Sequence, residues 1–157
     1  MTATIALRVN GRDVEVDAEP AELLADVLRD RLGLYGTRLG CHEGVCGTCT
    51  ILLDGLPARA CLVLAGQADG AALTTVEGLA DGDVLSPLQA AFVEHGAAQC
   101  GFCTAGMLVA ATALLRDEAS PSEARVREAL AGNLCRCTGY AKIVDAVIAA
   151  SAGGGKR

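Results

Sequence analysis

Eight cysteines are the residues of this chain whose type and spacing point most directly to chemistry, and they fall into two groups of four. Thiolates are soft ligands that favour zinc, copper(I) and iron–sulfur clusters. Two sets of four ligands with no cysteine left over predict two metal centres. The first set is spaced C-x4-C-x2-C-x11-C and consists of Cys41, Cys46, Cys49 and Cys61. The second set is a C-x2-C pair followed later by a C-x-C pair, and consists of Cys100, Cys103, Cys135 and Cys137.

The surroundings of the cysteines favour iron–sulfur clusters. The C-x4-C-x2-C run is the spacing that binds plant-type [2Fe–2S] clusters. Glycines within and before the run CHEGVCGTC allow the backbone to approach a cluster and to direct N–H groups toward its sulfurs. In the second group each cysteine pair precedes a predicted helix, whose N-terminus offers N–H groups and partial positive charge to an anion. A small protein with two one-electron centres is expected to conduct electrons.

Other interpretations of the same residues have less support. Two structural zinc sites are an alternative, because C-x2-C pairs also occur in zinc ribbons, but the remaining spacings are unusual for zinc. Structural disulfides are disfavoured in a reducing compartment. His42 lies beside Cys41, but four cysteines already complete that set of ligands, so we interpret His42 as an exposed loop residue.

A small sheet is expected to position the first group. Two alternating segments, residues 3–9 and 14–18, flank Asn10-Gly11, which is a strong hairpin signal. The other predicted elements are a helix over 21–32, a strand over 49–53 that ends at Asp54-Gly55, and a strand over 73–76. Together these elements predict an α+β, β-grasp, plant-type ferredoxin-like fold.

From Ser86 onward every predicted element is helical. Ser86-Pro87 opens a short helix to about residue 95, and Ser120-Pro121 opens another, with Glu123 completing a capping box with Ser120. A cysteine pair and a longer helix, 104–116 and 140–150, follow each of them. This repeat predicts an all-α four-helix bundle with pseudo-twofold symmetry. We predict a ferredoxin-like [2Fe–2S] domain over residues 1–78 and a helical [2Fe–2S] domain over 79–157, with a disordered tail from Gly153.

Composition excludes several classes of function. The formal net charge is −6 and no basic run is present, so a nucleic-acid partner is not expected. No apolar stretch reaches the roughly 18 residues that span a bilayer, and the first residues lack the features of a signal peptide. We therefore expect a cytoplasmic protein without a membrane partner. No catalytic triad, carboxylate pair or phosphate loop is visible, so bond chemistry is expected on partner chains.

Three motifs resemble a known family: GCHEGVCGTCTILLDG (40–55), QCGFCTAGM (99–107) and GNLCRCTGY (132–140). They are similar to the iron–sulfur subunit of the molybdenum hydroxylases, the xanthine dehydrogenase/aldehyde oxidoreductase family, over about residues 4–150. The resemblance implies that each group of four cysteines binds one [2Fe–2S] cluster. It also implies that Gln99 and Cys137 contact a molybdopterin, Gln99 through a hydrogen bond. The family commonly has Pro at the position of Ala105.

The resemblance further implies partners and a direction of electron flow. The partners are a large molybdopterin-binding subunit and a medium FAD-binding subunit, in one heterotrimer or a dimer of heterotrimers. Substrate is hydroxylated at molybdenum with oxygen from water, and electrons pass through the pterin, the second cluster and the first cluster to FAD. The alternative is a stand-alone ferredoxin-type carrier, for which residues 1–78 would suffice.

Overall fold

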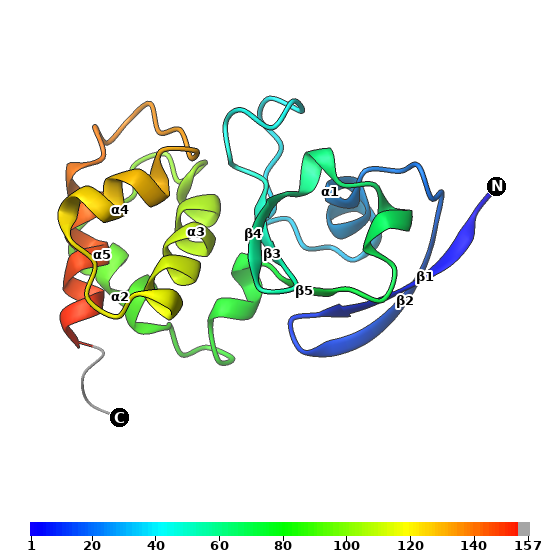
Figure 1. The fold of residues 1–157 in the computed structure, drawn as a ribbon, viewed down its shortest axis with the longest axis horizontal. Coiled ribbons are helices and arrows are strands. Elements are labelled where there is room, and N and C mark those ends of the chain that lie inside the picture. The colour runs from blue at the N-terminus through cyan, green and yellow to red at the C-terminus, as the bar shows by residue number, and fades with distance from the viewer. Residues whose placement is uncertain (154–157) are drawn as a thin grey trace.

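The computed structural model describes residues 1–153 and has two lobes, a sheet lobe and a helical lobe (Figure 1). The sheet lobe contains the N-terminal strands, and the helical lobe contains α2 to α5. Of the predicted tail, Gly153 is the last residue of α5, and residues 154–157 lie outside the described residues. No helix among residues 1–153 is long and apolar enough to cross a membrane.

The sheet is mixed, with strand order β2-β1-β5-β3-β4. The predicted hairpin is present, and its turn residues Asn10 and Gly11 have φ angles of 51° and 80°, as a two-residue hairpin turn requires. Strand β5 lies between β1, to which it is parallel, and β3, to which it is antiparallel. The strands are β1 (Ala3–Val9), β2 (Arg12–Ala18), β3 (Thr50–Leu53), β4 (Leu56–Arg59) and β5 (Ala72–Thr74).

The first helix is shorter and less regular than the sequence predicts. Helix α1 covers only Leu24–Asp26 and continues as the π-helical turn η1 (Val27–Arg31). The backbone before it stays extended, because Leu23 pairs with Leu64 and the Leu24 N–H donates to the Val63 carbonyl at 2.8 Å. A tertiary hydrogen bond has therefore replaced the first turn that residues 21–23 were predicted to form.

The helical lobe follows the predicted repeat, with one correction at a cap. Ser86 caps α2 as predicted: its Oγ accepts from the Gln89 N–H, and Gln89 Oε1 accepts from the Ser86 N–H. The capping box predicted at Ser120 is wrong, because Ser122 is the N-cap of α4 and accepts from the Arg125 N–H at 3.2 Å. The helices are α2 (Pro87–Glu94), α3 (Thr104–Asp117), α4 (Glu123–Leu130) and α5 (Ala141–Gly153). A residue before proline disfavours helical backbone, which explains why the helix begins after Pro121 and not at Ser120.

Helix α3 joins the two lobes. Val109 and Ala113 on α3 pack against Leu52 of β3 in a small buried cluster. This cluster lies between the larger core of the helices and the core beneath the sheet. The predicted division after residue 78 falls within the 3₁₀ turn η4 (Val76–Leu79), which also contacts this cluster.

Candidate metal centres

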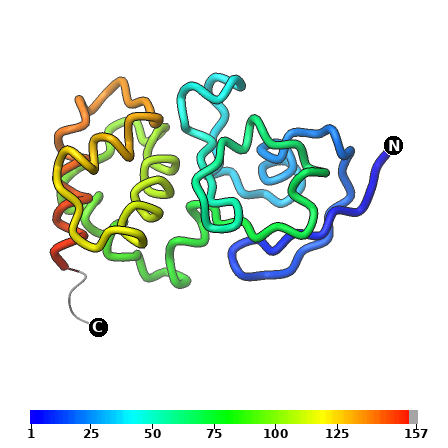
Figure 2. The backbone as a smooth tube through the Cα atoms, viewed as in Figure 1, coloured from blue at the N-terminus to red at the C-terminus, as the bar shows by residue number. Residues whose placement is uncertain are grey.

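The first group of cysteines lies in the long loop between η1 and β3 and in the turn η2 (Ala60–Leu62). The loop rises from the edge of the sheet lobe nearest the helices (Figure 2). The Cys46 N–H donates to Cys41 Sγ at 3.4 Å, and Cys46 Sγ lies 3.2 Å from the Thr48 hydroxyl. Cys49 and Cys61 are both buried, and Cys61 lies close enough to affect the pKa of the Cys49 thiol. The four side chains therefore lie as two adjacent pairs.

The local environment gives these thiols different pKa values. Backbone N–H groups, that of Cys46 first, lower the pKa of Cys41 to about 7. Burial raises the pKa of Cys49 to about 11. Thiolates are the forms that bind metal, so loading this site releases a proton from the buried thiol in particular.

The second group lies at the start of α3 and in the loop before α5. Cys103 is the N-cap of α3, and Cys135 lies close enough to affect the pKa of its thiol. The sulfurs of Cys137 and Cys100 are 3.5 Å apart, and both residues are exposed. This group too is made of two pairs: Cys103 is buried and Cys135 half-buried toward the helical core, whereas Cys100 and Cys137 lie at the surface.

Burial and hydrogen bonds also give the thiols of the second group different pKa values. Burial, followed by the nearby Cys135 thiol, raises the pKa of Cys103 to about 12. Burial opposes ionisation of Cys135 as well, but hydrogen bonds from Thr138, first through its hydroxyl, lower the pKa of Cys135 to about 7. At the surface, the backbone N–H of Phe102 lowers the pKa of Cys100.

The paired arrangement fits a two-iron cluster. Each group presents two pairs, and the charge of one pair acts on the other, as Cys46 does on Cys49 and Cys100 on Cys103. A [2Fe–2S] cluster has four thiolate ligands shared between two irons, whereas structural zinc needs four ligands around one ion. The donor sets therefore suit two-iron clusters better than zinc.

Comparison with known proteins agrees with this geometry. Residues 7–86 match the 2Fe-2S iron-sulfur cluster binding domain, and residues 75–148 match the [2Fe-2S] binding domain. The nicotine 6-hydroxylase small subunit of Paenarthrobacter nicotinovorans is 57% identical over 92% of this chain and 87% of its own length. A probable xanthine dehydrogenase subunit of Bacillus subtilis is 49% identical over 88% of this chain and 79% of its own length.

A solved structure, quinoline 2-oxidoreductase from Pseudomonas putida 86, superimposes with a TM-score of 0.94 at 50% identity and covers 97% of this chain and 95% of the matched chain. The chain belongs to the iron–sulfur small subunits of the molybdenum hydroxylases. Its cofactors as a member of this family are two [2Fe–2S] clusters, one for each matched domain. The iron–sulfur subunit is thus the electron-transfer part of an oxidoreductase.

The structure also places Gln99 and His42, which were discussed from the sequence, and Tyr140, which follows the second group of cysteines in this iron–sulfur subunit. Gln99 is exposed next to Cys100. His42 is exposed in the loop with a φ of 58°. Tyr140 packs against the helical core, and its hydroxyl accepts the Cys135 N–H at 2.9 Å. The tyrosine therefore both fills the core and supports the second group of cysteines.

Three residues near the cysteines were not identified from sequence: Thr48, Thr138 and Asn133. The two threonines lie two or three residues after a cysteine inside the motifs CGTC and CRCTGY, and this spacing was the available signal. Asn133 is 2% exposed, and its amide donates to the Gly47 carbonyl at 2.9 Å and to Thr50 Oγ1 at 3.1 Å. Its partners are distant in sequence, so no local pattern identified it.

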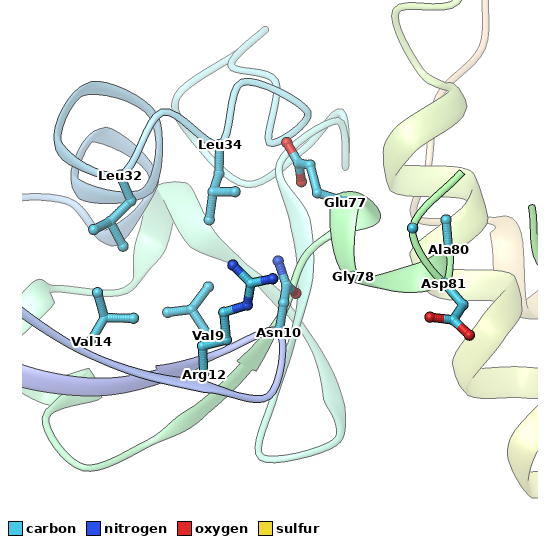
Figure 3. A pocket seen from close by; sticks show the side chains of 11 residues that line it. Val9, Asn10, Arg12, Val14, Leu32, Leu34, Glu77, Gly78, Ala80 and Asp81 are labelled. Carbon is cyan, nitrogen blue, oxygen red and sulfur yellow. The ribbon is translucent and has the colours of Figure 1, made fainter. Parts of the chain in front are cut away.

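A separate cleft of about 560 Å³ lies beside the β1–β2 hairpin (Figure 3). Asn10 and Arg12 of the hairpin face Leu34 and Glu77 across it. No cysteine lines this cleft. Glu77 is already engaged, because it accepts the Gly36 N–H at 2.7 Å and so holds the start of the cysteine loop. We therefore assign the chemistry of the chain to the cysteine loops.

Proposed function

We propose that this chain carries electrons from a molybdopterin on a large partner subunit to FAD on a medium partner subunit. The complex would hydroxylate a small organic substrate with oxygen from water. The observation that carries the proposal is the series arrangement of the two cysteine groups. The second group has one pair at the surface and one toward the interior, and the first group lies behind it across the junction of the lobes.

Each cysteine group is proposed to bind one cluster. When bound, a [2Fe–2S] cluster takes up and passes on single electrons. The chain's own part is to offer the thiolates in pairs, to donate N–H and O–H groups to their sulfurs, and to bury the inner pair of each group. The proposed ligand sets are Cys41, Cys46, Cys49 and Cys61 for the first cluster, and Cys100, Cys103, Cys135 and Cys137 for the second.

The contact with the pterin is assigned to Gln99 and Cys137. Both are exposed on the side of the second group, next to Cys100, where a partner subunit can approach. Gln99 has an amide that can both donate and accept hydrogen bonds, which suits a pterin edge. Cys137 would then bind iron of the second cluster on one side and contact the pterin on the other.

The finer description of the helical lobe belongs to the same proposal. We interpret α2 to α5 as a four-helix bundle with pseudo-twofold symmetry. Each half has a serine-capped helix of eight residues, a cysteine pair and a helix of 13 or 14 residues. Helix α2 packs against α5 and α3 packs against α4. The division into domains 1–78 and 79–157 is proposed on the same grounds, with η4 as the connection.

The experiment is to isolate the chain with the subunits that co-purify and to measure iron, sulfide, molybdenum and flavin. Two distinct [2Fe–2S] EPR signals, together with molybdenum and flavin in the complex, are expected. Nicotine, quinoline and xanthine form the first substrate panel, because the similar proteins are named for them. A chain that is fully loaded but purifies alone, and that reduces an acceptor without molybdenum or flavin, would instead be a stand-alone ferredoxin-type carrier.

A further inference from the structure

The two cysteine groups touch through a short backbone contact between the lobes. The segment before Cys135 lies against the loop that contains Cys46, and the Leu134 N–H donates to the Cys46 carbonyl at 2.8 Å. Leu134 is the residue directly before Cys135. One hydrogen bond and a few covalent bonds therefore connect a cysteine of the first group with a cysteine of the second.

Asn133 holds this contact from the inside. Its side-chain amide donates to the Gly47 carbonyl and to Thr50 Oγ1, both in the sheet lobe. Arg59 links the same two segments from the outside, because it donates to Thr50 Oγ1 and to the Gly132 carbonyl, each at 2.6 Å. A buried amide is costly unless its hydrogen bonds are made, so Asn133 stabilises one relative position of the two segments.

Two glycines allow the segments to come this close. A Cβ at Gly47 would overlap the Gly132 carbonyl oxygen, and a Cβ at Gly106 of α3 would overlap the Gly47 carbonyl oxygen. The Cβ that a substitution of Gly106 would add would also lie 2.9 Å from the Asn133 amide nitrogen. The segments thus meet at backbone distance, and a shift of either segment would lengthen the Cys46–Leu134 hydrogen bond.

We propose that Asn133 is a positioning residue for electron transfer between the two clusters. It fixes the spacing of the two cysteine loops and keeps the Cys46 carbonyl bonded to the Leu134 N–H. This inference rests on the proposed function, since it needs both clusters. In the step concerned, one electron leaves the reduced cluster of the second group and enters the oxidised cluster of the first; no bond to hydrogen or carbon is made or broken.

The test compares Asn133→Ala with Asn10→Ala in the purified complex. Asn10 is a suitable control because its side chain also makes two hydrogen bonds, both to Thr75, and neither is to a cysteine loop or to the segment before Cys135. Its φ of 51° makes alanine strained there, so the control also lowers stability. Iron content and thermal unfolding are measured first, to compare the two variants at full cluster loading.

The decisive readout is the magnetic interaction between the two reduced clusters, seen as splitting of their EPR signals after reduction with dithionite. We expect Asn133→Ala to weaken or lose the splitting and to slow reduction of the first cluster by substrate, because magnetic coupling and electron transfer between two centres both fall as the distance between them grows. Asn10→Ala should retain both. Unchanged splitting and rate in a fully loaded Asn133→Ala complex would overturn the proposal.

A second pair of variants covers the case in which the Asn133→Ala protein does not bind both clusters. Gly106→Ala should push the loops apart and weaken the splitting, whereas Gly153→Ala, at a helical glycine with open space around it, should not. Hydrogen exchange of the wild-type Leu134 amide gives an independent answer: rapid exchange in the loaded complex would contradict the proposed hydrogen bond. If the wild-type complex lacks two [2Fe–2S] signals, the proposed function fails instead, so the two failures are distinguishable.

Discussion

Thr138→Val is expected to lower the reduction potential of the second cluster. The Thr138 hydroxyl lies 3.1 Å from Cys135 Sγ and accepts the Tyr140 N–H at 3.1 Å, so its own proton is available to the sulfur. Removing a donor from a thiolate ligand disfavours the more negative, reduced state. Valine keeps the shape of threonine closely, which limits other changes at the site.

The size of this shift follows from the hydrogen bond. Bonds to charged groups contribute about 1.5–3 kcal/mol, and only the part that differs between the two redox states moves the potential. If that part is about 1 kcal/mol, the potential falls by roughly 40 mV, because about 59 mV corresponds to a tenfold change for one electron. A redox titration followed by EPR measures the value for each cluster separately.

Thr48→Val is the matched control for the first group. The Thr48 hydroxyl also lies near a sulfur, that of Cys46, but it donates its proton to the Arg38 carbonyl at 2.9 Å. We therefore expect the potential of the first cluster to change much less than that of the second does in Thr138→Val. Equal shifts in the two variants, or no shift in Thr138→Val, would refute the reasoning from hydroxyl direction.

Three further predictions concern the order of the centres and the stability of the helical lobe. In the complex, Cys103→Ser should remove the second cluster and block reduction of flavin by substrate, whereas Cys49→Ser should leave the second cluster reducible; flavin reduced normally in Cys103→Ser would contradict the order. Met107→Ala, at a side chain with no exposed surface, should lower the free energy of unfolding by about 2–5 kcal/mol in denaturant titration. Ala105→Pro, in the first turn of α3, should raise that free energy by about 0.4–1 kcal/mol; a lower midpoint of thermal unfolding would show that the backbone there does not suit proline.

Local signals in the sequence predicted most of the fold. The Asn10-Gly11 turn and the Ser86 cap are short-range features, and the structure has both. Strand β4 was missed because its four residues, LPAR, show no clear alternation and include Pro57, which edge strands tolerate. The shortened first helix depends on the pairing of Leu23 with Leu64, which no local pattern encodes.

The candidate site was predictable as two groups but not as pairs. The sequence places Cys100 and Cys103 in one C-x2-C motif, yet in the structure each pairs with a cysteine from the other motif. The partners are set by the start of α3 and the loop before α5, which meet only in the folded chain. The role of Asn133 was hidden for the same reason, since its hydrogen bonds reach back 83 and 86 residues along the chain.

Because α3 packs against β3 of the sheet while Cys103 caps its N-terminus, the two lobes have no free hinge between them. Arg116 at the far end of α3 adds a further tie, donating to the Gly55 carbonyl at 2.7 Å. A carrier that swings between donor and acceptor is slowed by a viscous solvent, because the motion must displace solvent. Electron passage through this chain should be indifferent to viscosity, so glycerol would slow the arrival of substrate but not the transfer between the centres.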